Sequence, residues 1–149
     1  DLYHGVMYGI MGIGAVSLVV GVAIIGRMVM RDKGARMSED VGWGVGIGFI
    51  LSTVLTLITA ATLSAMPGHF VGTPGGAVLP FFGWSATVGD LRPSHFVALH
   101  AMQAIPLLAL WAEGRKSARA WVIGGAVIYA AVTLGLYVQA LMGLPMIRL

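Results

Sequence analysis

Cysteine is absent from this chain of 149 residues, and charged residues are scarce. Without a thiol, the chain can form no disulfide, no thiolate metal site, no iron–sulfur cluster and no covalent c-type haem attachment. Only 10% of the residues are charged, whereas soluble domains carry about 25%. Together with a hydrophobic fraction of 58%, this scarcity indicates a chain that folds in lipid.

The length of 149 residues favours a single domain. The chain begins at Asp1 and not at methionine, so we expect it to be either processed or the ordered part of something longer. Its first apolar run is too long for a signal peptide and follows no basic region. The formal net charge is +3, but the basic residues lie between apolar runs, which is typical of membrane topology and not of a nucleic-acid-binding surface.

Long apolar runs are what the sequence has in place of charge. A helix of about 20 apolar residues crosses the hydrocarbon core of a bilayer. Four stretches have this character: residues 3–28, 41–66, 94–111 and 120–141. Pro106, inside the third stretch, removes a backbone donor and is expected to kink that helix. We predict an all-α fold, a polytopic four-helix membrane bundle that forms one transmembrane domain over residues 1–149.

Basic residues predict the orientation of this bundle. Cytoplasmic loops of membrane proteins carry an excess of lysine and arginine. Two connections are basic, one with Arg27, Arg31, Lys33 and Arg36 and the other with Arg115, Lys116 and Arg119. The connection 67–93 contains one lysine or arginine, Arg92. We therefore predict a multi-pass protein of the bacterial inner membrane, with both basic connections in the cytoplasm and both termini on the outer, periplasmic side.

Glycines recur in the first two spans, at Gly5, Gly9, Gly12 and Gly14 and again at Gly42, Gly44, Gly46 and Gly48. Small residues at four-residue spacing let helix backbones approach closely in lipid. We expect these glycines to pack the first span against the second, and homodimerisation through the same faces is the alternative.

The connection 67–93 is rich in proline and glycine, which excludes a continuous helix, and yet it is apolar. We expect this outer loop to fold back on the outer ends of the helices as a cap, and partial re-entry into the bilayer is the alternative.

Histidine is concentrated at the outer side, where His4, His69, His95 and His100 all fall. Ionisable groups are costly in hydrocarbon and tend to face the interior of a bundle, and His100 is the deepest of the four. His95 and His100 are five residues apart, about 140° around a helix, so they cannot both point at one small metal ion from the same helix face. Gln103 follows His100 by three residues and shares its face.

Asp90 and Arg92 have an architectural explanation. A carboxylate just before a helix is favoured by the helix dipole and can cap free amides. Pro93 then suits the first helical turn. Arg92 can pair with Asp90 or extend toward lipid phosphate. We therefore predict a structural and electrostatic role for Asp90 and Arg92.

The run GHFVGTPGGAVLPFFGWSATVGDLRPSHFVALHAMQAIPLL combines a histidine- and glycine-rich loop with W-S, G-D-L-R, H-F and L-H-A-x-Q. The positions are His69, Gly72, Trp84, Ser85, Gly89, Asp90, Leu91, Arg92, His95, Phe96, Leu99, His100, Ala101 and Gln103. The pattern resembles the C-terminal half of a family of uncharacterised bacterial multi-span integral membrane proteins, and the first two spans resemble it only loosely. Those proteins are longer, with extra N-terminal spans, so the resemblance implies a piece or a shortened form. It implies no activity, because none is established for the family.

The first hypothesis for function is a cofactor-binding membrane protein that holds b-type haem or belongs to a quinone-linked redox complex. Four-helix membrane bundles hold such cofactors between spans, with histidines of different helices as axial ligands. His100 with His4 or His69 is the expected pair, His95 is the reserve and Gln103 completes the cofactor-binding set. Cytochrome b subunits usually present deep histidines on two helices, and here only His100 is deep.

Two further hypotheses belong to other classes. The small size and the glycine-rich faces favour a non-enzymatic accessory, scaffold or sensor subunit, associated with other membrane subunits or with copies of itself. A zinc-dependent lipid hydrolase is the other alternative, because a zinc site needs three protein ligands and an open position for water. Its residues would be His69, His95, His100, Asp90 and Ser85 or Ser94.

Overall fold

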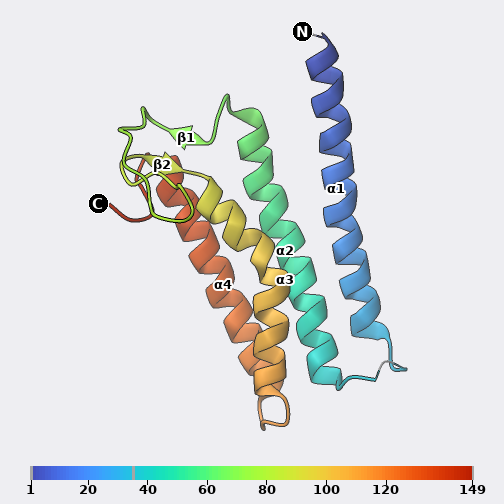
Figure 1. Ribbon diagram of the computed structural model, residues 1–149. Coiled ribbons are helices and arrows are strands. Elements are labelled where there is room, and N and C mark those ends of the chain that lie inside the picture. The colour runs from blue at the N-terminus through green and yellow to red at the C-terminus, as the bar shows by residue number, and fades with distance from the viewer. Residues whose placement is uncertain (1, 35, 149) are drawn as a thin grey trace.

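The computed structural model describes residues 2–34 and 36–148, which form four helices and one small strand pair (Figure 1). The elements are α1 (Leu2–Arg31), α2 (Glu39–Ala65), β1 (Phe70–Val71), β2 (Gly89–Asp90), α3 (Arg92–Ala112) and α4 (Ala118–Leu141). Each of the four helices is long and apolar enough to cross a membrane. The predicted all-α, four-helix architecture is confirmed to that extent, and every helix begins and ends within three residues of its predicted bounds.

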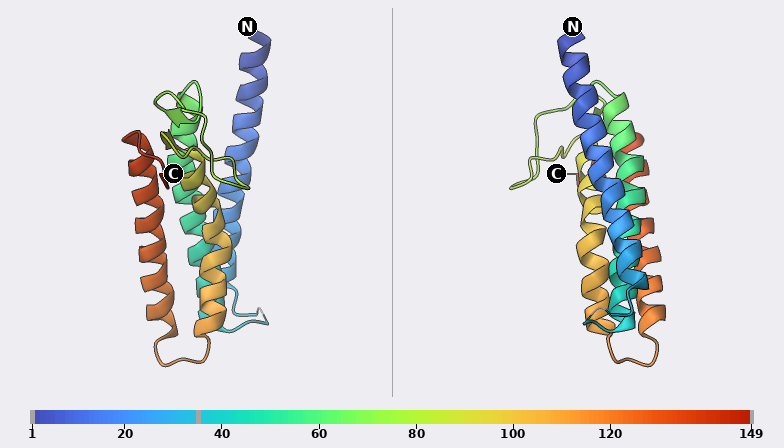
Figure 2. Two further views of the ribbon diagram at one scale, coloured as in Figure 1. Left: turned by 60° about the vertical axis from the view of Figure 1, so that its left-hand side comes forward. Right: turned by 90° about the vertical axis from the view of Figure 1, so that its right-hand side faces the viewer.

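The helices run alternately up and down, so that two ends of the bundle can be distinguished (Figure 1). The basic end carries the connections α1–α2 and α3–α4, and the loop end carries residues 66–91 and both termini. α2 packs against α1 on one side and against α3 on the other, and α4 packs against α3 and α2. α1 diverges from the other three helices toward the loop end (Figures 1 and 2).

Local signals explain where the helices begin and end. The side chain of Ser38 caps α2 by accepting from the amide of Val41 at 3.4 Å, and acidic residues in the first turn suit the helix dipole. Gly114, at φ 74°, makes the turn from α3 toward α4 in a conformation that favours glycine. Pro106 lies inside α3, which continues on both sides of it.

Small residues set the distance between α2 and α3. A Cβ added at Gly48 would lie 2.8 Å from Cδ of Pro106 and 3.0 Å from the carbonyl oxygen of Ala101, and one added at Gly44 would overlap the side chain of Ala109. Ala101 and Ala109 are themselves fully buried. In lipid, helix association depends on van der Waals packing of this kind, because the solvent is as apolar as the side chains.

The predicted packing of the first two spans through glycine is correct only near the basic end. Gly26 is buried against Phe49 and Gly46, and Gly42 lies against Val29. The glycines nearer the N-terminus have no atom of another segment within 4 Å of an added Cβ, and for them the prediction is wrong: Gly5, Gly9, Gly12 and Gly14. The reason is the divergence of α1, which separates its N-terminal half from α2.

Gly48→Ala is predicted to destabilise the bundle, because the methyl group forces α2 and α3 apart. Overpacking of a well-packed core costs about 1–3 kcal/mol. The melting temperature of the detergent-purified protein should fall. Gly124→Ala is the matched control, since a Cβ there meets nothing within 4 Å and alanine favours a helix over glycine. Equal melting temperatures for the two variants would contradict the packing described here.

Candidate functional site

The carboxylate of Asp90 is the centre of a hydrogen-bonded cluster at the loop end, where its side chain is only 1% exposed. Arg92 donates to it from Nη2 at 2.7 Å and from Nε at 3.0 and 3.2 Å. The backbone amides of Ser85 and Arg92 donate to it at 3.0 and 3.1 Å. A buried carboxylate is tolerated only when it is paired and hydrogen-bonded, so these donors determine the path of residues 85–92.

Arg92 connects this carboxylate to two other parts of the loop. Its Nη2 also donates to the carbonyl oxygen of Gly83 at 2.8 Å, and its guanidinium lies 5.4 Å from the centre of the Phe70 ring. Phe70 in turn pairs with Asp90 in the antiparallel β1–β2 ladder. The cluster of Asp90 and Arg92 therefore holds the start of α3, β1 and the loop before Trp84 in one arrangement.

The pKa of the Asp90 carboxyl reflects two opposing effects. Burial alone would raise this pKa, but the hydrogen bonds from Arg92 and from the amides of Ser85 and Arg92, together with the charge of Arg92, outweigh burial and lower it. A carboxyl whose pKa is lowered by folding stabilises the fold above its ordinary pKa, about 3.9. That stabilisation is lost as the pH falls from the ordinary value through the lowered one.

Neither candidate nucleophilic serine is free of backbone contacts. Ser85 is buried, and its Oγ accepts from the amides of Thr87 and Val88 at 3.2 and 3.1 Å. Ser94 is fully buried, and its Oγ donates to the carbonyl oxygen of Leu91 at 2.9 Å. Both hydroxyls thus stabilise local turns.

His95 is the histidine that points into the bundle. Its side chain extends from α3 toward α2 and is half-buried, with Nδ1 2.9 Å from the hydroxyl of Thr59. Thr59 is fully buried and also lies 3.0 Å from the carbonyl oxygen of Leu55. The Thr59 hydroxyl has one hydrogen, so when it donates to Leu55 it accepts from a protonated Nδ1 of His95. The buried hydroxyl of Thr56, one turn away, has no partner among the described residues.

His100 lies on the exposed face of α3, and the expectation that it faces the interior is wrong. Its ring packs on Phe96 at 4.0 Å between centroids, and Nδ1 lies 2.6 Å from the carbonyl oxygen of Phe96. A carbonyl only accepts, so Nδ1 of His100 carries a proton. Gln103, on the same face, is exposed as well. The inward face of α3 is instead made of Ala98, Ala101, Ile105 and Ala109, which admit the neighbouring helices.

The other two histidines lie on different segments. His4 is on the exposed N-terminal part of α1, with its ring 5.8 Å from that of Tyr3. The ring of His69 lies tilted against that of Phe70 in the loop, at 4.0 Å between centroids, and the carbonyl oxygen of His69 accepts from the amide of Leu91. Within residues 2–34 and 36–148, no three histidine, aspartate or glutamate side chains are placed to hold a metal ion. The three-ligand site of the hydrolase hypothesis therefore has no support in the geometry of these residues.

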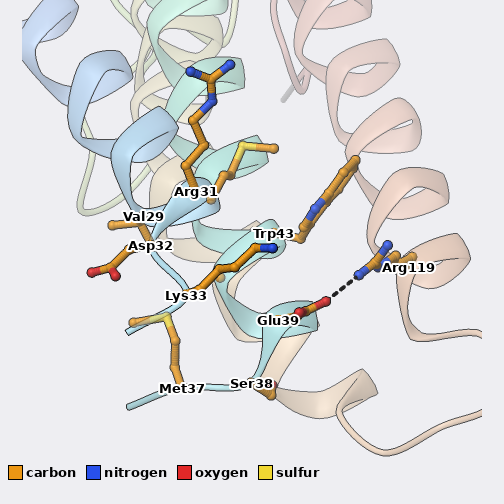
Figure 3. Close-up of a pocket in the computed structure, with 11 residues that line it drawn as sticks. Val29, Arg31, Asp32, Lys33, Met37, Ser38, Glu39, Trp43 and Arg119 are labelled. Carbon is orange, nitrogen blue, oxygen red and sulfur yellow. Dashed lines mark hydrogen bonds and ion pairs between the residues drawn. The ribbon is translucent and has the colours of Figure 1, made fainter. Parts of the chain in front are cut away.

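A hollow at the basic end was not recognised from the sequence. It has a volume of about 460 Å³ and is lined by the end of α1, the following connection and the starts of α2 and α4. Figure 3 shows Lys33 directed toward Trp43, and Glu39 paired with Arg119 across 3.2 Å. Its cationic residues are Arg31, Lys33 and Arg119, and its anionic ones are Asp32 and Glu39. The sequence held one signal for this hollow, because basic residues and Trp43 lie near the ends of apolar runs that a short connection joins.

Sequence reasoning also left Thr59 unassigned as the partner of His95. A signal for this contact was present, because the two residues lie at equal heights. Thr59 follows Trp43 by 59 − 43 = 16 residues, and His95 precedes Trp111 by 111 − 95 = 16 residues, with both tryptophans at the basic end. On antiparallel helices, equal separations from one end place two residues at the same level, about 24 Å along the axis.

Comparison with known proteins supplies no relative: no family model, no curated protein and no solved structure matches this chain.

Asp90→Asn is predicted to loosen the loop end, because the amide keeps the shape of the carboxyl and loses its charge. Breaking one side of such a pair costs about 2 kcal/mol or more. Amide hydrogen exchange should accelerate in residues 69–92, and the melting temperature should fall. Asp32→Asn is the control, since among the described residues its carboxyl accepts only from the amide of Gly34, in the exposed connection at the basic end. Equal effects of the two variants would contradict a structural role for Asp90.

The lowered pKa of Asp90 also predicts a pH dependence. Between pH 5 and pH 7 the difference in melting temperature between the wild type and Asp90→Asn should be constant. Below about pH 4 the carboxyl of the unfolded chain takes up a proton while that of the folded chain is still charged, so the stabilisation by the charge is lost and the difference should shrink. A difference that persists unchanged to the lowest pH at which the protein folds would show that the charge is not what matters.

Proposed function

We propose that this chain is a four-span protein of the bacterial inner membrane, with both termini outside, that acts as a non-enzymatic scaffold subunit of a larger membrane complex. The observation that carries the proposal is α1, in which Gly26 alone is buried while residues 2–18 are all exposed. We propose that a transmembrane helix of a partner subunit packs against this exposed part.

The face of α1 that would receive the partner helix continues the face that already packs on α2. Val19 and Gly26 meet α2, since the carbonyl oxygen of Val19 accepts from Thr53 at 2.8 Å and Gly26 lies against Gly46. Gly5, Gly9 and Gly12 precede these residues at the spacing of one helix face. Because α1 diverges toward its N-terminus (Figure 1), we infer from this spacing that the glycine face opens onto the angle between α1 and α2.

The contacts of the polar residues favour a scaffold over a hydrolase. The side chains that the hydrolase would need as acid, nucleophile or ligand are bonded within the chain: Asp90 to Arg92, Ser94 to Leu91 and His95 to Thr59. The first two bonds hold the loop at the start of α3 and the third joins α3 to α2, which supports a structural role for these side chains.

The scaffold proposal predicts crosslinking from one face of α1. Val16 follows Gly12 by four residues and shares its face, whereas Leu18 lies about 160° around the helix from Val16. Because the chain has no cysteine, Val16→Cys and Leu18→Cys each carry a single benzophenone–maleimide label. After irradiation in native membranes, the label at Val16 should give a discrete protein adduct and the label at Leu18 should give none.

The mass of that adduct distinguishes the partners. An adduct larger than this chain by the mass of another protein supports the proposal. An adduct of twice 15.6 kDa would show self-association and overturn the hetero-oligomeric scaffold. Labels that react only with lipid at both positions would leave α1 without a protein partner and would also overturn it.

Haem b binding is a second candidate function, favoured by one observation. His100 donates from Nδ1 to the Phe96 carbonyl, which leaves Nε2 as its ligand atom, as in axial and metal-bound histidines generally. Since His100 faces outward, a haem held there would lie between this chain and a partner. The group would supply electron transfer, and His100 and Phe96 would hold it.

An absorption spectrum decides between the two candidates. The scaffold proposal predicts that the chain, purified with its crosslinked neighbour, shows no Soret band when oxidised and no α or β band after reduction with dithionite. A Soret band that disappears in His100→Ala and persists in His4→Ala would establish haem and reject a purely structural role.

A further inference from the structure

The loop end carries an aromatic tip, defined as Pro80, Phe81 and Phe82, which the scaffold role does not use. Val78 and Ser85 form an antiparallel bridge at its base. Phe81 has φ 68°, in the left-handed region that bulky residues rarely adopt, and its exposed fraction is 105%. Phe82 is 55% exposed. A chain that presents two phenylalanines in a constrained turn presents them to an apolar environment.

The depth of this tip follows from the rings that contact it. Phe82 stacks on Trp84 at 4.4 Å, and the Phe96 ring of α3 lies 5.8 Å from Phe82 and 5.6 Å from Trp84. Phe96 is 111 − 96 = 15 residues from Trp111, which is about 22 Å along a helix. Trp111 and Trp121 pack together at the basic end, at 5.6 Å, as tryptophans do at a membrane interface.

With the basic end at one interface, the opposite boundary of the hydrocarbon core lies about 30 Å away. The rings of Phe96, Trp84 and Phe82 then lie about 8 Å inside that boundary. Figure 2, in its right-hand view, shows the loop leaving the end of the bundle and descending along its flank beside α3. The tip is thus beside the membrane-spanning part of the fold and not above it.

Two further properties suit a lipid environment. Residues 67–89 contain no aspartate, glutamate, lysine or arginine. Part of the backbone of this turn is also satisfied internally: the amides of Leu79, Phe82 and Gly83 donate to the carbonyl oxygens of Trp84, Pro80 and Leu79 at 2.7, 2.9 and 3.0 Å, and Pro80 has no amide proton. Each backbone polar group that is bonded within the protein lowers the cost of bringing irregular chain toward hydrocarbon.

We propose that the aromatic tip is a re-entrant anchor that inserts among the phospholipid acyl chains of the outer leaflet. The Asp90–Arg92 cluster lies behind it, because Arg92 holds the carbonyl oxygen of Gly83 at the end of the turn. Phe81 and Phe82 enter lipid. The loop is held against α3 by the bond from Arg92 to Gly83 and by the contacts of Phe82 and Trp84 with Phe96. This anchor does not depend on a partner for α1.

The experiment uses nitroxide labels in the cysteine-free chain, reconstituted into phosphatidylcholine–phosphatidylglycerol vesicles. Phe81→Cys carries the test label. Thr73→Cys, exposed in the same loop, is the aqueous control, and Ile128→Cys, 66% exposed on α4, is the lipid control. Collision rates are measured with oxygen, which concentrates in lipid, and with a water-soluble nickel chelate. Val78→Cys, 52% exposed, reports on the base of the turn should Phe81→Cys fail to fold.

The oxygen-to-nickel ratio at residue 81 should match that at residue 128 and exceed that at residue 73 several-fold. Adding Phe81→Asn to the Val78→Cys protein should lower the ratio at residue 78, because asparagine keeps the turn conformation but is poorly soluble in hydrocarbon. A nickel-accessible label at residue 81 would place the tip in water. A label that neither reagent reaches would place it against protein. Either result overturns the anchor and leaves the proposal for α1 unaffected.

Discussion

The buried carboxylate of Asp90 is the interaction on which the loop end depends. Removing a charge from water is costly, and the cost is offset only when donors surround the carboxylate. Here the donors come from Arg92 and from the backbone of Ser85. These bonds bring residues 85 and 92 to one carboxylate, in an arrangement where β2 lies beside β1 and Trp84 lies over the first turns of α3.

α2 is the helix that connects the rest of the bundle, and it does so with hydroxyls. Ser52 donates to the carbonyl oxygen of Leu99 on α3, Thr53 donates to that of Val19 on α1, and Thr62 bonds Tyr137 on α4. Hydroxyl groups between transmembrane helices contribute about 0.6 kcal/mol each on average, so none dominates. Their value is directional, because each fixes the rotation of one neighbour about its own axis. The glycines of the same helix fix the distance.

The four helices could be predicted because long apolar runs of this length leave few alternatives to a helix that could cross a membrane. The Asp90–Arg92 pair was also within reach, since both residues are close in sequence and precede a helix. The direction of His95 and His100 was not, because it depends on which face of α3 receives α2. Each of these faces carries one histidine. Depth along the helix favoured His100 as the inward-facing one, whereas His95 faces the interior. The deciding feature is the run of small residues Ala98, Ala101 and Ala109, which allows close approach and leaves Phe96 and His100 outside.

The two ends of the bundle differ in how firmly they hold α1. At the basic end, Gly26 against Gly46 and Thr53 against Val19 leave little room between α1 and α2. Toward the loop end, a Cβ added at any of the glycines of α1 meets no atom within 4 Å. A helix that entered the angle between α1 and α2 would therefore gain close backbone contact without breaking any contact described here. Association would cost no rearrangement of the core, because the core of α2, α3 and α4 is already complete without the N-terminal half of α1.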